Sequence, residues 1–446
     1  MTMTKNRRIL ALGTACALAA GVVVMAAGAG SASAAAPDTE GILCETGPTF
    51  DISTGSGHIS MPDGNVLFSW GYSTTSRAFQ LPGPVLCVTE GQKVTITLTN
   101  NLDEDTSLVF PGQGAVTADG SPSAPVADVN GRVTSLAPVA TANGGSVTYQ
   151  FTADKPGTYL YESGTDPDKQ VEMGLYGALI VRPAGHPDQA YADPRTKFQS
   201  GREFIHVLSQ VDPALHLAVE QKKPFDWSTY SPKYFLLNGR SAPDTVSPNN
   251  ASWLPNQPYG SMVHVKEQVQ LGYSDPITHL NPTLGGDTLP ALVRYINVMN
   301  TDSAFHPHGN TERVIAEDGQ PLETPTNPDS SYGSFLVDIG ANRTVDALFS
   351  WSNVEHWDPN SNPVPVAVSP YQDVLTSAST WYSMSPYLGK VGELPAGITS
   401  LNQCGEYYHM AHNHALQRAT NYGASFGGQM TLIRIDPADS QLCLAQ

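Results

Sequence analysis

The chain has 446 residues, and 41 acidic side chains against 23 basic ones give it a formal net charge of −18 at pH 7. A surface with this excess of negative charge repels phosphate backbones, which argues against a nucleic acid as partner. The length exceeds that of one small domain, and after the N-terminal segment no apolar run is long enough to span a membrane.

The N-terminal segment has the three parts of a signal peptide. A basic start at residues 5–8 is followed by an apolar run at about 9–27 and by the small residues 32–34. We therefore predict a cleaved signal peptide at residues 1–36 and a secreted, extracellular protein; the alternative is an uncleaved membrane anchor. Arg7 and Arg8 also resemble a twin-arginine signal, but we favour export by the general secretory route.

Cysteine usage agrees with export. Once the leader is removed, four cysteines remain, namely Cys44, Cys87, Cys404 and Cys443. An even number in an exported protein is typical of disulfides. Four cysteines can pair in three ways, and we favour Cys44–Cys87 with Cys404–Cys443 because each pair closes a loop within one end of the chain.

Period-two alternation is the regular signal after the leader. Val94, Ile96 and Leu98 alternate with threonines, and residues 147–151 repeat the pattern, which predicts strands with one face on a core and the other in water. Similar runs lie at residues 234–237, 291–298, 335–339, 345–351 and 430–435. Turn pairs such as Asn-Gly and Pro-Gly separate them. Many short strands with frequent turns predict all-β sandwiches.

Proline-rich segments divide the chain. Residues 183–201, between a strand at 178–181 and a new strand near Phe204, mark the best domain boundary. Residues 241–259 and 352–371 are rich in Pro and Asn and predict long loops inside the second domain.

Two motifs in the first half resemble those of multicopper oxidases, a family of the cupredoxin superfamily. Residues 106–112 (TSLVFPG) resemble the family's T-S-[IL]-H-[FW]-H-G, and residues 157–164 (GTYLYESG) resemble G-T-Y-W-Y-H-S-H. Residues 174–181 (GLYGALIV) then match the strand that follows in the family almost letter for letter.

The second half carries three further landmarks. Residues 233–245 (KYFLLNGRSAPDT) resemble the family's entry into a later domain, and residues 303–309 (SAFHPHG) align with H-P-x-H-x-H-G. Residues 407–430, with His412-Asn413-His414, resemble the region around H-C-H. The order and spacing of all these landmarks identify the chain as a divergent, bacterial-type member of the family with degenerate copper motifs.

The resemblance implies cupredoxin-like Greek-key β-sandwiches. The interval between the two sets of motifs is too short for a whole intervening domain. We therefore expect two domains, at residues 37–185 and 200–440, the second with long loop insertions; three domains is the alternative.

The positions that align with the family's type 1 copper ligands have changed. In the family a cysteine thiolate, two histidines and a weak axial ligand hold this copper. The aligned positions here are Ser303, Asn413 and Arg418, and Cys404 is the only cysteine nearby. Serine and asparagine are poor copper ligands, and arginine does not deprotonate. We therefore expect no blue copper site.

The oxygen-reducing cluster of the family takes histidines from both ends of the chain, and only one end keeps them here. Val109, Pro111, Glu162 and Gly164 replace the first four. Of these, Glu162 could bind metal through its carboxylate, although a hydrogen-bonded or exposed role is the alternative.

The second set of histidines is intact and carries the metal prediction. Alternation on a strand sends both histidines of an HxH pair to one side, so His306 with His308 and His412 with His414 can converge on a metal. His409 is a weaker fifth candidate or a supporting donor. The implied cofactor is copper, one or two ions and not a full four-copper set; the alternative is a relic cluster that binds nothing.

Two functions remain open from the sequence. In the first, the chain is a secreted copper protein with oxidoreductase activity, using oxygen or a small-molecule reductant that must meet the metal directly. In the second, it is a non-catalytic extracellular binding or structural protein on a cupredoxin scaffold. Neither involves a nucleic acid or a membrane span after cleavage of the leader, and both allow an oligomer.

Overall fold

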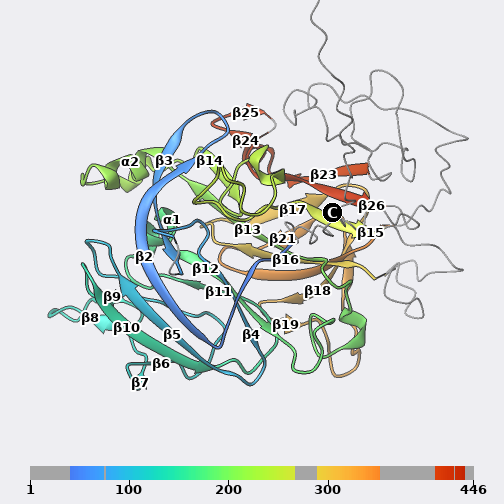
Figure 1. Ribbon diagram of the computed structural model, residues 1–446, viewed down its shortest axis with the longest axis horizontal. Helices are drawn as coiled ribbons and strands as arrows, with labels where there is room; N and C mark the ends of the chain where they lie inside the picture. The colour runs from blue at the N-terminus through green and yellow to red at the C-terminus, as the bar shows by residue number, and fades with distance from the viewer. Residues whose placement is uncertain (1–40, 75–76, 267–288, 352–406, 426, 437–446) are drawn as a thin grey trace, which may run out of the picture. The chain divides into compact units, whose positions relative to one another are not determined.

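The computed structural model describes residues 41–74, 77–266, 289–351, 407–425 and 427–436 (Figure 1). These residues are built mainly from β-strands, and strands of the two halves of the chain form separate sheets. The predicted signal peptide, the second predicted disulfide Cys404–Cys443 and the predicted loop at 352–371 lie outside the described residues.

Residues 44–182 form two sheets and a small hairpin, drawn in blue to green in Figure 1. The four-stranded sheet has the order β1 (Cys44–Thr46), β4 (Val85–Thr89), β12 (Tyr176–Arg182), β11 (Gly157–Glu162). The six-stranded sheet has the order β3 (Val66–Ser73), β2 (Thr49–Ser60), β5 (Lys93–Asn100), β10 (Gly145–Thr152), β6 (Thr117–Ala118), β7 (Ser121–Pro122). β8 (Val126–Ala127) pairs with β9 (Val133–Ser135).

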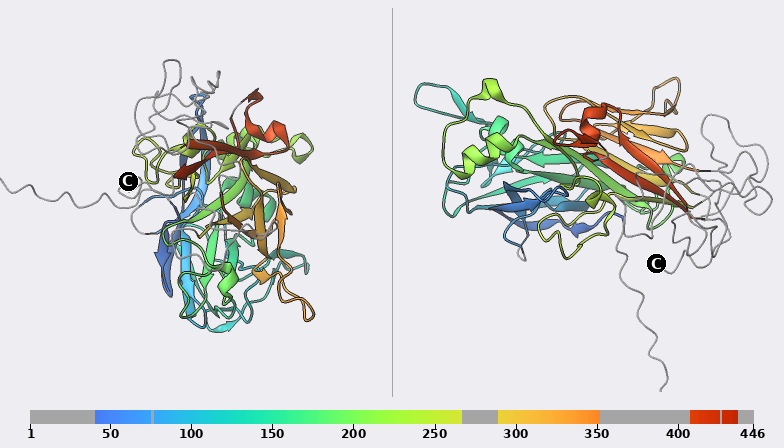
Figure 2. Two further views of the ribbon diagram at one scale, coloured as in Figure 1. Left: turned by 90° about the vertical axis from the view of Figure 1, so that its right-hand side faces the viewer. Right: turned by 90° about the horizontal axis from the view of Figure 1, so that it is seen from above.

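Residues 203–436 form two further sheets. The larger has the order β19 (Gln320–Pro321), β18 (Glu312–Glu317), β22 (Thr344–Phe349), β16 (Ala291–Asn297), β13 (Glu203–Val211), β14 (Tyr234–Leu237), β24 (Thr420–Asn421), β25 (Ala424–Ser425), with β20 (Tyr332–Ser334) paired to β18. The smaller has the order β15 (Val263–Lys266), β26 (Met430–Asp436), β23 (Tyr407–Asn413), β17 (Ser303–Pro307), β21 (Val337–Ile339). Figure 2 gives two more views of these strands.

Helices are short and serve as connections. The α-helices are α1 (Pro167–Met173) and α2 (Pro213–Glu220), and the 3₁₀ turns are η1 (Pro194–Thr196), η2 (Trp227–Thr229), η3 (Asp244–Val246) and η5 (Leu416–Ala419). At the start of α2, the Asp212 side chain caps the helix by accepting a hydrogen bond from the Ala214 amide. The helix then begins at Pro213, a position where a backbone N–H is not needed. In the described part of the chain no helix combines the length and apolar character needed to cross a membrane.

The predicted alternation is confirmed in the first half. Along β5 every second residue from Val94 is buried, and β10 repeats this from Val147. The expectation of half-buried strands is wrong for three strands of the second half, β16, β22 and β26, which are buried along their whole length, whereas β21 alternates as predicted. The physical reason is that these strands are covered on both faces.

The strands of the two halves pack into several apolar clusters, of which three are large. One cluster fills the first half around Ile96 and Tyr149, and a second fills the other half around Val293 and Phe305. The third joins residues of both halves, for example Ile180 of β12 with Val207 of β13. The large sheet of the second half therefore packs against the first half as well as against its own partner sheet.

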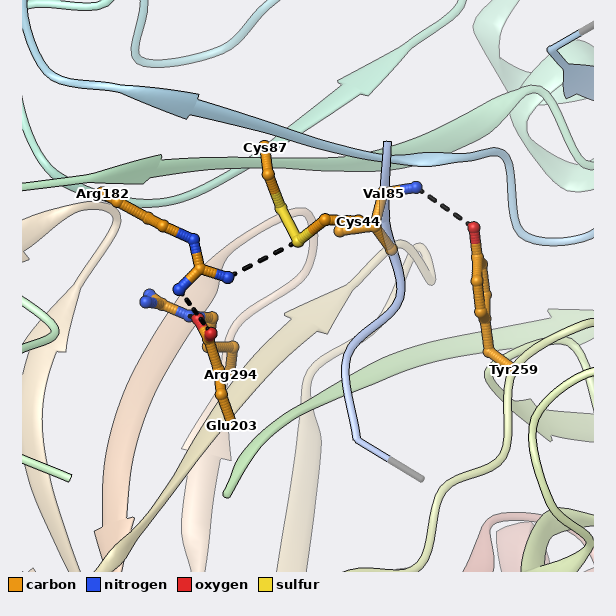
Figure 3. Close-up of a disulfide and its surroundings, with 7 residues drawn as sticks. All are labelled: Cys44, Val85, Cys87, Arg182, Glu203, Tyr259 and Arg294. Atoms are coloured by element: carbon orange, nitrogen blue, oxygen red, sulfur yellow. Dashed lines mark hydrogen bonds and ion pairs between the residues drawn. A yellow bond between two sulfur atoms is a disulfide. The ribbon is translucent and has the colours of Figure 1, made fainter. Parts of the chain in front are cut away.

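A buried ionic network crosses the seam between the halves (Figure 3). Arg294 is fully buried; its Nε lies 2.7 Å from Glu203 and its Nη1 lies 3.3 Å from Asp346. Arg182 of β12 reaches the other oxygen of Glu203 at 2.6 Å. Thr158 of β11 donates to Asp346 at 2.5 Å. Each of these charged groups stabilises its buried partner, because burying either charge without the other would cost several kcal/mol, on the order of the desolvation of one ion.

The predicted Cys44–Cys87 disulfide is confirmed. It joins β1 to β4, and Arg182 places a guanidinium nitrogen 3.5 Å from the Cys44 sulfur (Figure 3). The predicted strand at 335–339 is shorter than expected, because Phe335 and Leu336 precede β21. The predicted loop at 241–259 is confirmed as irregular apart from η3.

Candidate metal centre

Two neighbouring strands of the smaller sheet carry the four retained histidines. β17 and β23 run antiparallel, and His306 pairs directly with His412. His308 and His414 continue the same alternation, and their amides donate to the carbonyls of Met410 and Ala304, respectively. Residues two apart on a strand share a face, so all four side chains leave the sheet on one side.

The four imidazole rings gather within van der Waals reach of one another. The ring centres of His306 and His308 are 4.6 Å apart, and those of His306 and His414 are 5.2 Å apart. His308 and His412 bring their Nε2 atoms to 3.1 Å. The other ring separations are 5.6 Å for His306–His412 and 5.9 Å for His412–His414.

Backbone carbonyls orient two of these rings. His306 Nδ1 donates to the Phe335 carbonyl, and His412 Nδ1 donates to the Asn413 carbonyl at 2.9 Å. A carbonyl only accepts, so these Nδ1 atoms carry the proton and the Nε2 atoms keep their lone pairs. Metal-binding histidines are commonly held in this way.

Electrostatics favours the neutral imidazoles that metals require. Burial, together with the nearby His306, His412 and His414, lowers the pKa of His308 to about 4. Burial also lowers the pKa of His412. These rings are therefore unprotonated at neutral pH, and little proton competition opposes metal binding.

The residue types and spacing fit copper or another late transition metal, which imidazole binds well. The Nε2 atoms of His308 and His412, 3.1 Å apart, would be donor atoms for such an ion. Among the described residues, however, no group of three or more His, Cys, Asp or Glu side chains has its donor atoms placed to hold a metal. His308 and His412 instead hydrogen-bond to each other.

The weaker candidates lie apart from this face. His409 is offset by an odd number of residues from His412, and its ring lies against Trp351, with 6.2 Å between ring centres, and beside Gly309. Burial, together with the nearby His308, lowers its pKa to about 4. Its role as a fifth ligand or supporting donor stays a prediction.

Glu162 has a different partner. Its Oε1 accepts a hydrogen bond from Asn342 at 2.7 Å, and burial raises the pKa of its carboxyl. Val109 pairs with Glu162 through the backbone and packs beside Gly164. Pro111 lines a cavity of about 250 Å³ together with Asn342. In the structure the Glu162 carboxyl therefore accepts a hydrogen bond from a side-chain amide, and its role as a metal ligand stays a prediction.

The positions aligned with type 1 copper ligands hold a hydrogen-bonded amide network. The Asn413 side chain donates to Ser303 Oγ at 2.8 Å and to Gln429 Oε1 at 2.7 Å, and all three residues are buried. Gln429 in turn donates to the Ser209 carbonyl at 2.9 Å. Arg418 donates to the Thr301 hydroxyl at 2.8 Å.

Sequence reasoning missed several residues around the cluster. Phe335 supplies both the carbonyl that orients His306 and a ring 5.7 Å from it. Gln429, just before β26, contacts Asn413, and Trp351, just after β22, contacts His409. Only the final Gly427–Met430 match of the H-C-H landmark pointed to Gln429; no local pattern marked the other two.

A buried carboxyl lies in the core beneath this sheet. Glu312 accepts from the Tyr295 hydroxyl at 2.9 Å, and burial raises the pKa of Glu312 from 4.5 to about 8. The unfolded chain releases this proton near its ordinary pKa while the folded chain retains it. The free energy of unfolding therefore falls as the pH rises from about 4.5 to about 8, by a total on the order of a few kcal/mol.

We accordingly expect Glu312→Gln to flatten this pH dependence and to stabilise the protein more at pH 8 than at pH 5. Urea unfolding at the two pH values measures the difference. The exposed Glu323→Gln serves as the control and should leave the slope unchanged. Identical slopes for Glu312→Gln and the unaltered protein would contradict the assignment.

Comparison with known proteins gives a consistent picture. Residues 73–186 match a family model described as multicopper oxidase. The chain is 34% identical to an L-ascorbate oxidase of Brassica rapa subsp. pekinensis over 280 residues, which are 57% of this chain and 44% of that protein. It is 29% identical to multicopper oxidase CTB12 of Cercospora beticola over 291 residues, 62% of this chain and 39% of that protein. The match thus spans less than half the length of these relatives.

Solved structures show the same fold. The blue copper oxidase from Nitrosomonas europaea aligns with a TM-score of 0.55 and 19% identity, over 88% of this chain and 86% of that one. Multicopper oxidase mgLAC aligns with a TM-score of 0.54 and 19% identity, over 87% and 86%. The predicted cupredoxin-like, all-β fold is confirmed.

Proposed function

We propose that this chain, whose residues 73–186 match a multicopper oxidase family model, binds copper through His306, His308, His412 and His414 and acts as an oxidoreductase. The carrying observation is the convergence of these four imidazoles on one face, with two of them oriented by backbone carbonyls. Bound copper would supply one-electron redox chemistry and a site for oxygen. We further propose that the protein is secreted after removal of residues 1–36.

We propose that electrons reach this centre without a type 1 copper. The Asn413 network supports this, because the aligned side chains satisfy one another with hydrogen bonds and offer no thiolate. The reductant must then approach the histidines directly. His414 is exposed and His306 half-buried, which leaves an approach for a small molecule.

A non-catalytic scaffold is the second candidate, and one observation favours it. The His308–His412 hydrogen bond supports it, because two of the four rings already satisfy each other without a metal. On this hypothesis the sandwich carries a binding surface, and the histidines are a relic.

Copper loading separates the two candidates. We expect the protein without its leader to retain one or two copper ions per chain after removal of excess metal. His306→Ala/His412→Ala should abolish that binding, because it removes a ligand from each pair, whereas His58→Ala/His186→Ala removes two exposed histidines elsewhere and should retain it. Metal analysis with optical and EPR spectra provides the measurement, and circular dichroism checks that the variants fold.

Each result has a clear meaning. Copper that is lost only in the cluster variant, with no intense blue band, supports the proposal and justifies oxidase assays. Absence of bound copper from the unaltered protein would overturn the copper proposal in favour of the scaffold. An intense blue absorption would show that the assignment of Ser303 and Asn413 to the type 1 positions is wrong.

A further inference from the structure

The loop after α2 carries an exposed tryptophan, Trp227, that packs against two half-buried aromatic rings. The Trp227 side chain is flanked by Phe225, with ring centres 5.5 Å apart and planes at 89°, and by Tyr230 at 6.0 Å. Trp227 itself is 46% exposed. Single exposed apolar residues are ordinary, but here an exposed tryptophan is held between two half-buried rings, which gives a larger aromatic surface than a single side chain would.

This cluster is held in place by hydrogen bonds. The Tyr230 hydroxyl donates to Glu172 at 2.7 Å and accepts from Gln210 at 2.8 Å. Asp226 accepts from the amide and hydroxyl of Ser228, which fixes the turn that presents Trp227. α2 before the loop is anchored by His216, which bonds to the Phe68 carbonyl of β3. The rings therefore form a preorganised surface, and ligand binding would cost little ordering.

The charge of this loop is opposite to that of the chain as a whole. Residues 221–233 contain three lysines and one aspartate, in a chain of net charge −18. Lys222 pairs with Asp103, but Lys223 and Lys233 bond to the neutral side chains of Gln221 and Ser231. These two lysines flank the aromatic residues in sequence. Because each donates to a neutral group, no ion pair among the described residues neutralises its charge, and both charges can attract an anionic ligand.

From these observations we propose that the loop at residues 221–233 binds an anionic polysaccharide. The C–H face of a sugar ring packs on Trp227, and acidic groups of the polymer pair with Lys223 and Lys233. Hydroxyl groups of Ser228, Thr229 and Ser231 surround the rings and suit a ligand rich in hydroxyls. The site does not depend on the histidine cluster or on copper.

Affinity electrophoresis of the metal-free protein tests the proposal, with polygalacturonate in the gel as probe and dextran as its neutral counterpart. We expect polygalacturonate to retard the protein and dextran not to. Trp227→Ala and Lys223→Gln/Lys233→Gln should each weaken binding by about tenfold or more. Trp227→Tyr, which keeps a ring, should lose less. Binding should disappear at about 1 M salt, where charges are screened within about 3 Å.

Matched variants elsewhere control for general effects. Trp253→Ala removes another exposed tryptophan, and Lys93→Gln/Lys155→Gln removes two exposed lysines; both should bind as the unaltered protein does. Absence of retardation by polygalacturonate would overturn the proposal. Equal retardation by dextran would overturn the role of the lysines. If Trp227→Ala is retarded as strongly as the unaltered protein, the binding is a general attraction of a polyanion, and the proposed aromatic site is wrong.

Discussion

Replacing Arg294 with methionine is expected to lower the free energy of unfolding by about 3–5 kcal/mol. The guanidinium is fully buried and contacts Glu203 at 2.7 Å and Asp346 at 3.3 Å. Methionine fills much of the volume, but the carboxylates of Glu203 and Asp346 stay buried between the two halves and lose the positive charge and hydrogen bonds of Arg294. Urea unfolding at pH 7 measures the loss, because urea does not screen the charges.

The exposed Arg343 provides the matched control. It pairs with Asp318 and Glu317, but its side chain is 48% exposed. Arg343→Met should therefore cost no more than about 1 kcal/mol. A triple variant that adds Glu203→Gln and Asp346→Asn to Arg294→Met should recover part of the loss, since it removes the stranded charges. Equal effects of Arg294→Met and Arg343→Met would contradict the buried network.

The same network gives the seam an acid sensitivity. Arg294 and Arg182 together hold the pKa of the Glu203 carboxyl below its usual value of 4.5, despite an opposing effect of burial. A depressed pKa stabilises the folded state fully above the unfolded pKa, and that stabilisation is lost as the pH falls through the folded value. The contribution of Glu203 is therefore complete at neutral pH and disappears only in acid.

Local sequence patterns predicted individual strands well but not what covers them. The alternation at Val94–Leu98 is a property of the strand itself, and it matches the burial along β5. Burial of both faces of β13 and β16 depends on a core shared with the other half of the chain. That core brings together residues such as Ile180 and Val207 from separate sheets, and no periodicity within one segment reports such packing.

In the candidate site, too, local sequence patterns predicted part of the arrangement and contacts between distant segments determine the rest. The two HxH patterns on strands were enough to predict that four rings share a face, because alternation fixes side-chain direction. The pairing register of β17 and β23 places His306 opposite His412, and no local sequence pattern predicts that register. The orienting carbonyl of Phe335 and the partner of Glu162, Asn342, come from segments 29 and 180 residues away along the chain, so they could only be found in the structure.

Arg240 is the second position at which we expect a large effect, because one buried guanidinium fastens the irregular segment at residues 241–259. Its Nε donates to the Gln257 carbonyl at 2.8 Å and its Nη1 to the Ser247 carbonyl at 2.7 Å. Nη2 donates to the Pro248 carbonyl at 3.2 Å. Burial lowers the pKa of Arg240 to about 10, so the group remains charged at neutral pH.

Arg240→Met should remove these bonds together and leave several carbonyls buried without a donor, at a cost of about 3–5 kcal/mol in the free energy of unfolding. Arg240→Lys keeps the charge, but its single ammonium cannot reach carbonyls on both sides of the segment, so an intermediate loss is expected. Arg132→Met, at a side chain that is 82% exposed, is the control and should be nearly neutral. Urea unfolding gives the three values, and limited proteolysis shows where each variant opens. If Arg240 fastens the segment, the first cuts in Arg240→Met fall within residues 241–259; cleavage elsewhere with unchanged stability would contradict that role.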